Sequence, residues 1–201
     1  GAKRSETFYT GNEGEEKALK TYNYDYAGLI VKTTTTFAYT ADALSSSVTT
    51  KLQDGLVKKS ETIYTGNEGE EKAVRTYNYN FNGDAIKTVT EFFYTNDALS
   101  SSNTNRVANV TDVMDDVVLG AMKSITIYSG NETEEKALKT YNYNYAGDQI
   151  KTITSFTYAN DALSLSTTNR AANVTGDTAA VVIGAKRSET FYTGNEGEEK
   201  A

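Results

Sequence analysis

"SETFYTGNEGEEKALKTYNYDYAG", residues 5–28, is the first copy of a motif that recurs along the chain. It returns as "SETIYTGNEGEEKAVRTYNYNFNG" at residues 60–83 and as "SITIYSGNETEEKALKTYNYNYAG" at residues 124–147, and a fourth copy begins at residue 188. Self-similarity at such a period is typical of arrays built from one supersecondary unit. The sequence therefore predicts three repeats, residues 5–59, 60–123 and 124–187, and the start of another at 188–201.

The three repeats together form one super-repeat, which begins again at residue 184. Residues 1–18, "GAKRSETFYTGNEGEEKA", return without a change as residues 184–201, whereas neighbouring repeats are only similar to one another. Identity from one super-repeat to the next, beside looser similarity within it, indicates that complete super-repeats were copied as blocks. We therefore expect the chain to be a slice of a much longer one.

Each repeat has the residue pattern of β-strands. In residues 18–26, Tyr22, Tyr24 and Tyr26 alternate with smaller polar residues, and this period of two is typical of a strand. Residues 3–10 and 30–39 are rich in β-branched and aromatic residues, and "GNEGEE" and "NGDA" supply the glycine and asparagine that tight turns favour. The sequence predicts an all-β fold: repeated antiparallel β-meander or hairpin units in a continuous superhelical sheet or tube. The following "DALSSS" is predicted to be a turn or loose edge, which gives nine strands per super-repeat.

A connector of variable length joins the repeats. In repeat 2 its apolar residues fall at helical spacing: Val110, Val113, Met114, Val117, Val118 and Ala121. The matching stretch of repeat 3 has a β-branched run and two glycines, and the connector of repeat 1 is nine residues shorter. These features favour a strand or loop over a helix. The connectors of repeats 2 and 3 also hold the glycosylation sequon "NVT" at Asn109 and Asn173.

The composition argues against several classes of function. The chain has no His or Cys, so the commonest general base and the thiolate ligands are absent. Its net charge is −7, with Lys and Arg spread singly, which disfavours nucleic acid as a partner. No apolar run approaches the ~18 residues that would span a bilayer. Every Ser, Thr, Asp and Glu that could do chemistry recurs from repeat to repeat, so we expect no enzyme, no catalytic residue and no cofactor.

The tyrosine positions and the glycine turn are the candidate sites. A tyrosine ring can pack in a core while its hydroxyl finds a partner, and exposed rings can instead stack on sugars or pass charge; core packing is favoured. The predicted structural residues are Tyr22, Tyr24, Tyr77, Tyr79, Tyr141 and Tyr143, with Gly28, Gly83 and Gly147. Carboxylate oxygens are the ligands that Ca²⁺ prefers, so Glu13, Glu15 and Glu16 are weak calcium candidates, against the simpler interpretation of a solvated turn.

"TYNYDYAG" resembles the YD repeats of the RHS family, whose signature is Tyr-x-Tyr-Asp-x-x-Gly. Tyr22, Tyr24, Asp25 and Gly28 match it, whereas repeats 2 and 3 hold Asn80 and Asn144 in place of the aspartate. The similarity covers about eight residues of each repeat. It implies a ribbon of β-hairpins that spirals around a hollow interior in a secreted or surface shell. The chain also resembles the giant, repeat-dominated surface proteins of environmental bacteria, which implies an extracellular or cell-surface location in a bacterium.

These observations favour a structural function. The leading hypothesis is a segment of a very long secreted or cell-surface protein that forms an extracellular fibre, tube or coat. An adhesin or glycan-binding stalk is the alternative, and an RHS-type shell around a cargo domain outside this slice is a third possibility. The expected partners are adjacent repeats of the same chain, neighbouring chains in a filament, and, for the adhesin, a glycan or a cell surface.

Overall fold

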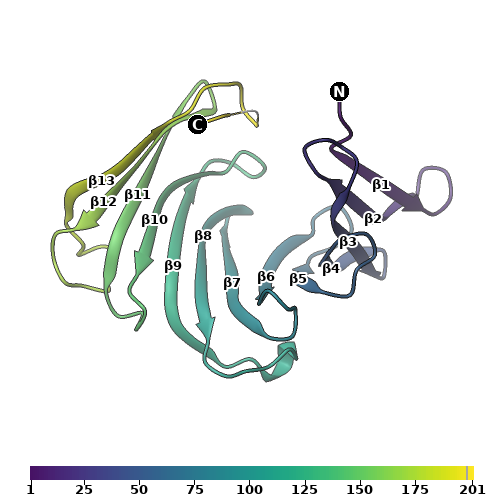
Figure 1. Cartoon of the computed structure of the whole chain (residues 1–201), viewed down its shortest axis with the longest axis horizontal. Helices are drawn as coiled ribbons and strands as arrows, with labels where there is room; N and C mark the ends of the chain where they lie inside the picture. The colour runs from purple at the N-terminus through teal and green to yellow at the C-terminus, as the bar shows by residue number, and fades with distance from the viewer. Residues whose placement is uncertain (198) are drawn as a thin grey trace. The chain divides into compact units, whose positions relative to one another are not determined.

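The fold is a single antiparallel sheet whose strands follow one another in chain order. A computed structural model describes residues 1–197 and 199–201. It contains a 13-stranded sheet with the order β1 to β13 (Figure 1). In the described part of the chain the one helical element is a 3-10 turn, η1 (Met114–Asp116). The predicted all-β, antiparallel meander is therefore confirmed.

Four strands fall in each predicted repeat. In repeat 1 they are β1 (Ser5–Thr10), β2 (Lys17–Tyr24), β3 (Val31–Thr40) and β4 (Ala43–Lys51). In repeat 2 they are β5 (Lys58–Thr65), β6 (Lys72–Tyr79), β7 (Ile86–Thr95) and β8 (Ala98–Val107). In repeat 3 they are β9 (Leu119–Ser129), β10 (Lys136–Tyr143), β11 (Ile150–Ala159) and β12 (Ala162–Ala171), after which β13 (Ile183–Phe191) begins the next copy.

The prediction of three strands per repeat was wrong, because "DALSSS" opens the fourth strand. The tight turn before β4 places Ala41 and Asp42 at φ 47° and 69°, the positive values that a two-residue hairpin turn of this kind requires. β4 is then held by pairs of small polar side chains across strands. The hydroxyl of Thr49 lies 2.9 Å from that of Thr35 on β3, and Ser47 is buried. Serine in a run gives no strand signal by itself, but these pairs stabilise the strand.

Threonine pairs of the same kind recur across the sheet. Each joins two hydroxyls at one constant sequence separation, at 2.8–3.0 Å. The described pairs are Thr7–Thr21, Thr35–Thr49, Thr62–Thr76, Thr126–Thr140 and Thr154–Thr168. This constant spacing indicates that the hairpins keep one register from repeat to repeat.

The chain divides into two compact bodies, residues 1–90 with 107–118 and residues 91–106 with 119–201. In the first body a buried cluster is formed by Tyr77, Tyr79, Ile86 and Val89, and the connector residues Met114 and Val117 pack against it. In the second body the cluster consists of Tyr141, Ile150 and Ile153, with the connector residue Val181 packed against it. The connectors therefore cover the apolar face of the sheet in both bodies.

A β-bulge interrupts the alternation of buried and exposed residues along β3. Strict alternation would place Val31 and Thr33 on one face, yet Val31 and Thr34 are the buried residues of this strand. The register explains this result, because Asn23 pairs with Thr33 and Tyr24 pairs with Val31, which leaves Lys32 as an extra residue. The same shift occurs between β10 and β11.

The connector between β8 and β9 is a loop with the single turn η1, so the loop interpretation is confirmed over the helix. Asn109 braces this loop: its side-chain amide donates to the carbonyl of Asp116 at 2.8 Å and accepts from the backbone amide of Val118 at 2.9 Å. Asn173 makes the equivalent bonds in the next connector. Both asparagines of the sequons thus bind connector backbone. Within the described residues, no helix is long and apolar enough to cross a bilayer.

Candidate functional site

The contacts that join one repeat to the next form the most regular side-chain cluster of the structure. Lys17, at the start of β2, donates to the carboxylate of Asp42 at 2.8 Å and to its carbonyl at 2.7 Å. The same ammonium group lies 3.3 Å from the carboxylate of Glu68, in the β5–β6 turn of the next repeat. The bond to Asp42 raises the pKa of Lys17. We call this set the lysine junction.

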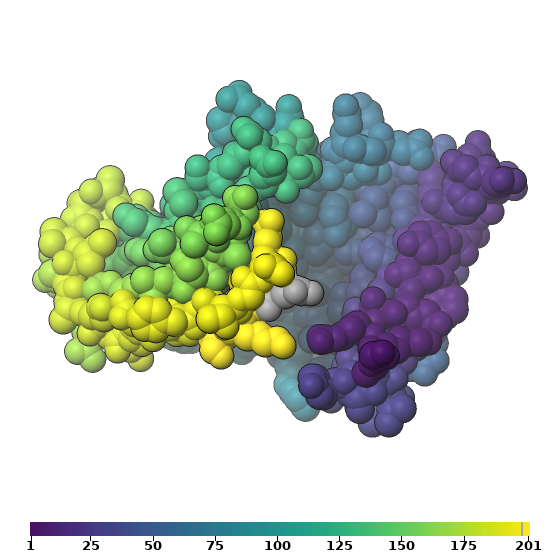
Figure 2. All heavy atoms as spheres, turned by 90° about the horizontal axis from the view of Figure 1, so that it is seen from above, coloured from purple at the N-terminus to yellow at the C-terminus, as the bar shows by residue number. Residues whose placement is uncertain are grey.

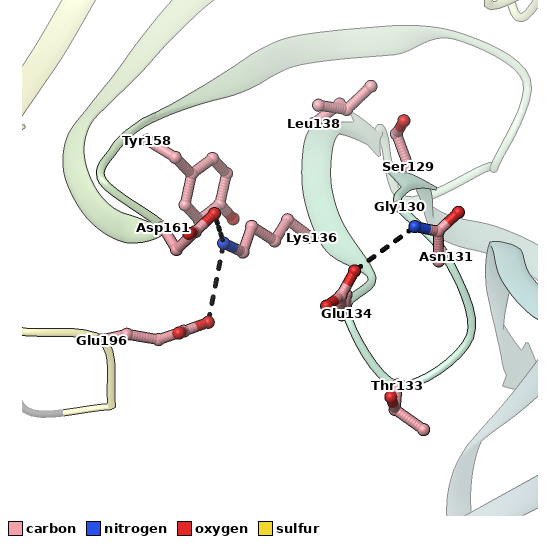
Figure 3. A pocket seen from close by; sticks show the side chains of 10 residues that line it. All are labelled: Ser129, Gly130, Asn131, Thr133, Glu134, Lys136, Leu138, Tyr158, Asp161 and Glu196. Atoms are coloured by element: carbon pink, nitrogen blue, oxygen red, sulfur yellow. Dashed lines mark hydrogen bonds and ion pairs between the residues drawn. The ribbon is translucent and has the colours of Figure 1, made fainter.

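The lysine junction returns in the second body. Lys136 lies 2.7 Å from Asp161 of its own repeat and 3.6 Å from Glu196 of the following copy. Figure 3 shows its ammonium group between the two carboxylates. The bond to Asp161 raises the pKa of Lys136. In repeat 2 the equivalent sequence positions hold Lys72, Asp97 and Glu132.

In the three later glycine turns a second glutamate binds backbone in the preceding repeat. Glu71 accepts the amide of Leu44 at 2.8 Å and also the amide of Gly69 in its own turn at 2.9 Å. The bond from Leu44 lowers the pKa of Glu71. The equivalent bonds run from Leu99 to Glu135 and from Leu163 to Glu199. We call this contact the glutamate cap. It joins the hairpin between the third and fourth strands of one repeat to the glycine turn of the next repeat.

The ammonium group of each junction lysine lies over a tyrosine ring. The ammonium of Lys17 lies 5.5 Å from the ring centre of Tyr39, and that of Lys136 lies 5.6 Å from the ring centre of Tyr158. Each tyrosine hydroxyl donates to a carbonyl at the start of the neighbouring strand, at 3.0 and 2.9 Å. Open polar cavities of about 380 and 760 Å³ surround the two junctions. The lining of the second cavity is drawn in Figure 3.

Cations also meet aromatic rings at the turns between the second and third strands of a repeat. Lys51 at the end of β4 lies over the ring of Phe81 and donates to its carbonyl. Arg106 on β8 lies 5.1 Å from the ring centre of Tyr145 and donates to the carbonyl of Asn144 at 3.4 Å. These rings are otherwise open to solvent, at 84% and 85% exposure. Repeats 1 and 2 thus contact the following repeat through a cation–ring pair as well as through the glutamate cap.

The three predicted glycines occupy equivalent positions, at φ values of 74°, 74° and 78°. A Cβ atom on Gly28 would lie 2.6 Å from the backbone nitrogen of Lys3, and one on Gly83 would lie 2.7 Å from that of Lys58. Gly147 lies in the same way against Met122. Both the left-handed backbone and the close approach to the first strand of the repeat therefore require glycine.

The aspartate of the YD-like motif and the asparagines that replace it both accept hydrogen bonds from the turn backbone. Asp25 accepts the amides of Leu29 and Ile30 at 2.9 and 3.2 Å, and the first of these bonds lowers its pKa. The side-chain oxygen of Asn144 accepts the amides of Gly147 and Asp148 at 2.8 and 3.2 Å. Aspartate and asparagine both present an oxygen to the turn backbone, so their exchange leaves the turn intact.

The predicted tyrosines differ in burial. Tyr22, Tyr77, Tyr79 and Tyr141 are buried, whereas Tyr24 and Tyr143 are partly exposed. Their hydroxyls have partners: Tyr22 donates to Asp54 at 2.7 Å, and Tyr24 donates to Glu6 at 2.9 Å. Tyr26, which the alternation assigned to the same face, lies beyond β2 and is 92% exposed.

The calcium candidates do not converge on one point in the described structure. Glu13 and Glu15 are exposed, and Glu16 accepts the amide of Gly14 in its own turn at 3.0 Å. Among the described residues, no group of three or more acidic side chains could hold a metal ion. Calcium binding by the glycine turn stays a prediction.

Sequence reasoning missed the lysine junction, although a signal for it was present. The lysine of "EEKA" precedes the aspartate of "DAL" at the same spacing in all three repeats, as Lys17 and Asp42 show in the first. The fold and the junction together define a repetitive β-sheet protein whose repeats are joined by the same side-chain contacts. In comparisons with protein-family models and with curated protein sequences, no match to this chain is found.

Proposed function

We propose that the chain is a structural segment of a very long secreted or cell-surface repeat protein that forms an extracellular fibre, tube or coat. The observation that supports this proposal is the identity of the junctions. Lys17, Asp42 and Glu68 in the first body correspond to Lys136, Asp161 and Glu196 in the second. A chain can then grow by adding repeats without any new kind of contact.

The strand order supports growth in one direction. Consecutive strands are neighbours, so each added repeat extends the sheet at its end. Twelve strands per super-repeat at ~4.8 Å correspond to about 58 Å of sheet for every super-repeat. Wide sheets twist and tend to coil or close, which favours the superhelical or tubular form.

Arrays of one, two and four complete super-repeats test the proposal. Electron microscopy should show a contour length that grows by a constant increment per super-repeat while the cross-section stays the same. Heat denaturation should shift to higher temperature with the first added super-repeats, because each new junction stabilises both neighbours. Arrays whose super-repeats unfold independently, at one temperature for every length, would contradict the proposal.

A specific observation favours the adhesin as a second candidate. Each repeat presents an aromatic ring at the same exposed turn, namely Tyr26, Phe81 and Tyr145. An exposed aromatic ring at this turn of each repeat can stack on a sugar unit of a glycan. Replacing all three by alanine should abolish binding on a glycan array while leaving the circular dichroism unchanged, if this function is the right one. The RHS resemblance also remains a proposal, and it rests on the YD-like motif. The bacterial, extracellular location is a proposal that rests on this resemblance and on the resemblance to giant, repeat-dominated surface proteins.

A further inference from the structure

The short connector of repeat 1, residues 52–57, carries an exposed apolar and basic surface. Leu52 and Leu56 are 61% and 96% exposed, and Lys59, near the start of β5, is also exposed. The carbonyl of Lys32 accepts the amide of Leu52 at 2.9 Å, so the exposed Leu29 of the turn before β3 lies at the same end of the sheet. Figure 2 shows the atoms of repeat 1, in purple and indigo, at the molecular surface. We call these five residues the leucine–lysine patch.

This patch stays open to solvent when neighbouring repeats are present. Asp84 and Asp148 hold the position of Leu29 in repeats 2 and 3, and both are exposed although a preceding repeat lies beside them. Leu52 and Leu56 lie between repeats 1 and 2 and are exposed with both repeats in place. Apolar residues that gather on a surface mark sites of interaction with another molecule. Repeat 1 therefore presents such a site where the other repeats have polar residues.

The connector of repeat 2, residues 108–118, carries an exposed apolar surface of the opposite charge. Val110 and Val113 are 91% and 49% exposed. Asp112, Asp115 and Asp116 are also exposed, and their carboxylates make no ion pair among the described contacts. We call these five residues the valine–aspartate patch. Its charges are therefore available to a partner.

The connector of repeat 3 shows that the loop does not need these charges. In repeat 2 the amide of Asp116 donates to the carbonyl of Val113 at 3.2 Å, and in repeat 3 the amide of Ala180 donates to the carbonyl of Asp177 at 3.3 Å. The two loops thus close the same turn, although residues 179–180 are alanines in place of two aspartates. The aspartates of repeat 2 are therefore not required for the local fold.

Both patches belong to connectors that lie on one face of the sheet in the first body. The carbonyl of Leu52 accepts the hydroxyl of Thr34, while Met114 packs against the cluster that includes Val89. Thr34 and Val89 hold the same position in their repeats, so the two connectors cover the same face. We propose that the leucine–lysine patch of one copy of the chain packs against the valine–aspartate patch of a second copy, which joins chains side by side.

Charge selects this pairing over the alternatives. Two leucine–lysine patches repel each other, as do two valine–aspartate patches, whereas the unlike patches attract. The aliphatic side chains add the attraction of buried apolar surface. Because both patches lie on one face, a second copy that meets this face across a two-fold axis forms both contacts at once.

The contact is small, so single chains should associate weakly. A stable interface buries more than about 1,000 Å², which a few side chains on each side do not reach. In the proposed array, on which this step rests, every super-repeat would carry one patch of each kind. Contacts that recur along two long chains act together, so weak association of one pair becomes firm association of the array.

Charge exchange tests the pairing in the full 201-residue chain. Sedimentation at concentrations up to about 500 µM should show a rise in mass with concentration for the wild type, because weak association needs high concentration. The basic patch made acidic (Lys32→Glu with Lys59→Glu) and the acidic patch made basic (Asp115→Lys with Asp116→Lys) should each sediment as monomers alone. An equal mixture of the two variants should associate again, because each then meets an unlike patch.

Matched variants separate this contact from general effects of charge. Lys123 and Lys151 correspond to Lys59 and Lys32 but lie in the second body, so Lys123→Glu with Lys151→Glu changes the net charge equally and should leave association unchanged. Leu29→Asp introduces the residue of repeat 2 and should weaken association several-fold. Circular dichroism and Tm should stay as in the wild type for each variant.

Zero-length cross-linking tests the residue pairs directly. A carbodiimide joins an amine to a carboxylate with loss of water, and mixing unlabelled with ¹⁵N-labelled chains identifies products between copies. Peptides that link Lys59 of one copy to Asp115 or Asp116 of the other are expected by mass spectrometry.

Three results would overturn the proposal. They are a wild type that stays monomeric at every concentration, charge variants that associate alone as strongly as the wild type, and a mixture that associates no better than its components. The length series of complete super-repeats tests growth along the chain and does not depend on side-by-side contact. The array can therefore stand if this contact fails.

Discussion

Thr34→Val is expected to destabilise the first body, although valine has nearly the same shape. Thr34 is 2% exposed, and its hydroxyl makes two hydrogen bonds to the short connector of repeat 1. It donates to the carbonyl of Leu52 at 2.8 Å and accepts the amide of Asp54 at 3.0 Å. The corresponding residues of repeats 2 and 3, Val89 and Ile153, are apolar and fully buried.

The magnitude follows from the groups left without partners. An unsatisfied buried backbone group costs about 1–3 kcal/mol, whereas the extra methyl group returns up to ~0.8 kcal/mol. Leu52 and Asp54 are exposed as residues, so water replaces part of the lost bonding. We expect a net loss of about 1–2 kcal/mol in the free energy of unfolding. For a chain of about 200 residues this lowers Tm by roughly 2–8 °C.

The assay combines urea unfolding with hydrogen exchange at the Asp54 amide, which should lose protection in Thr34→Val. Val89→Thr is the control, because it buries a hydroxyl in an apolar cluster and should also destabilise. A second control replaces the short connector by that of repeat 2 in the Thr34→Val background, which should recover stability. A neutral Thr34→Val with full protection at Asp54 would refute the coupling between connector and buried residue.

Three further predictions concern the junction, the pH range and the glycine turn. Lys136→Met should raise the rate of amide hydrogen exchange in residues 192–197 with little change in Tm, because it removes the contact to Glu196. The control variant Glu13→Gln should leave the exchange of these residues unchanged. Unfolding free energy measured against pH should fall below about pH 4.5 and above about pH 10.5. Hydrogen bonding lowers the pKa of Glu71 in the folded state, so the stability that this carboxylate contributes is lost as the pH falls through that pKa. Hydrogen bonding raises the pKa of Lys17 in the folded state, so the stability that this ammonium group contributes is lost as the pH rises through that pKa. Gly28→Ala should cost more stability than Gly14→Ala, since both have positive φ but only the Cβ at Gly28 meets backbone; equal losses in thermal unfolding would contradict this reason.

Much of the architecture could be predicted from the repeated sequence. The period, the antiparallel hairpins and the first three strands of each repeat follow from the alternation of residues 18–26 and from the glycine turns. The fourth strand could not be predicted, because the Ser and Thr residues of β4 gain their stability from pairs such as Thr35 with Thr49. Such pairs depend on which strand lies alongside.

The candidate site was harder to predict than the fold. The buried tyrosines were found from their alternation, but the lysine junction joins turns that are far apart in sequence. A lysine such as Lys17 looks like a solvated surface charge until the neighbouring turn is placed beside it. The bulge at Lys32 could not be predicted from the sequence either, because one extra residue in a strand does not change its composition detectably.

Some contacts within a repeat differ from one repeat to the next. In repeat 2, Lys58 pairs with Glu61 at 2.9 Å, and Glu61 also accepts the hydroxyl of Tyr79. In repeat 3 both charged positions are apolar, as Met122 and Ile125, and the equivalent tyrosine donates instead to a connector carbonyl at 2.8 Å. The two charges are lost together, which avoids leaving a single unpaired charge in the cluster.

The lysine junctions show no such loss of charge, and the geometry gives a physical reason. A contact within a repeat needs to match only its own partner, so the pair can change together. A lysine junction, by contrast, must fit the glycine turn of the repeat that follows. If the lysine or aspartate of one junction changes, the glutamate in the glycine turn of the next repeat has to change with it, although that turn is nearly the same in every repeat. The constancy of Lys17 and Lys136 with their carboxylates agrees with the proposed array, which grows by adding repeats.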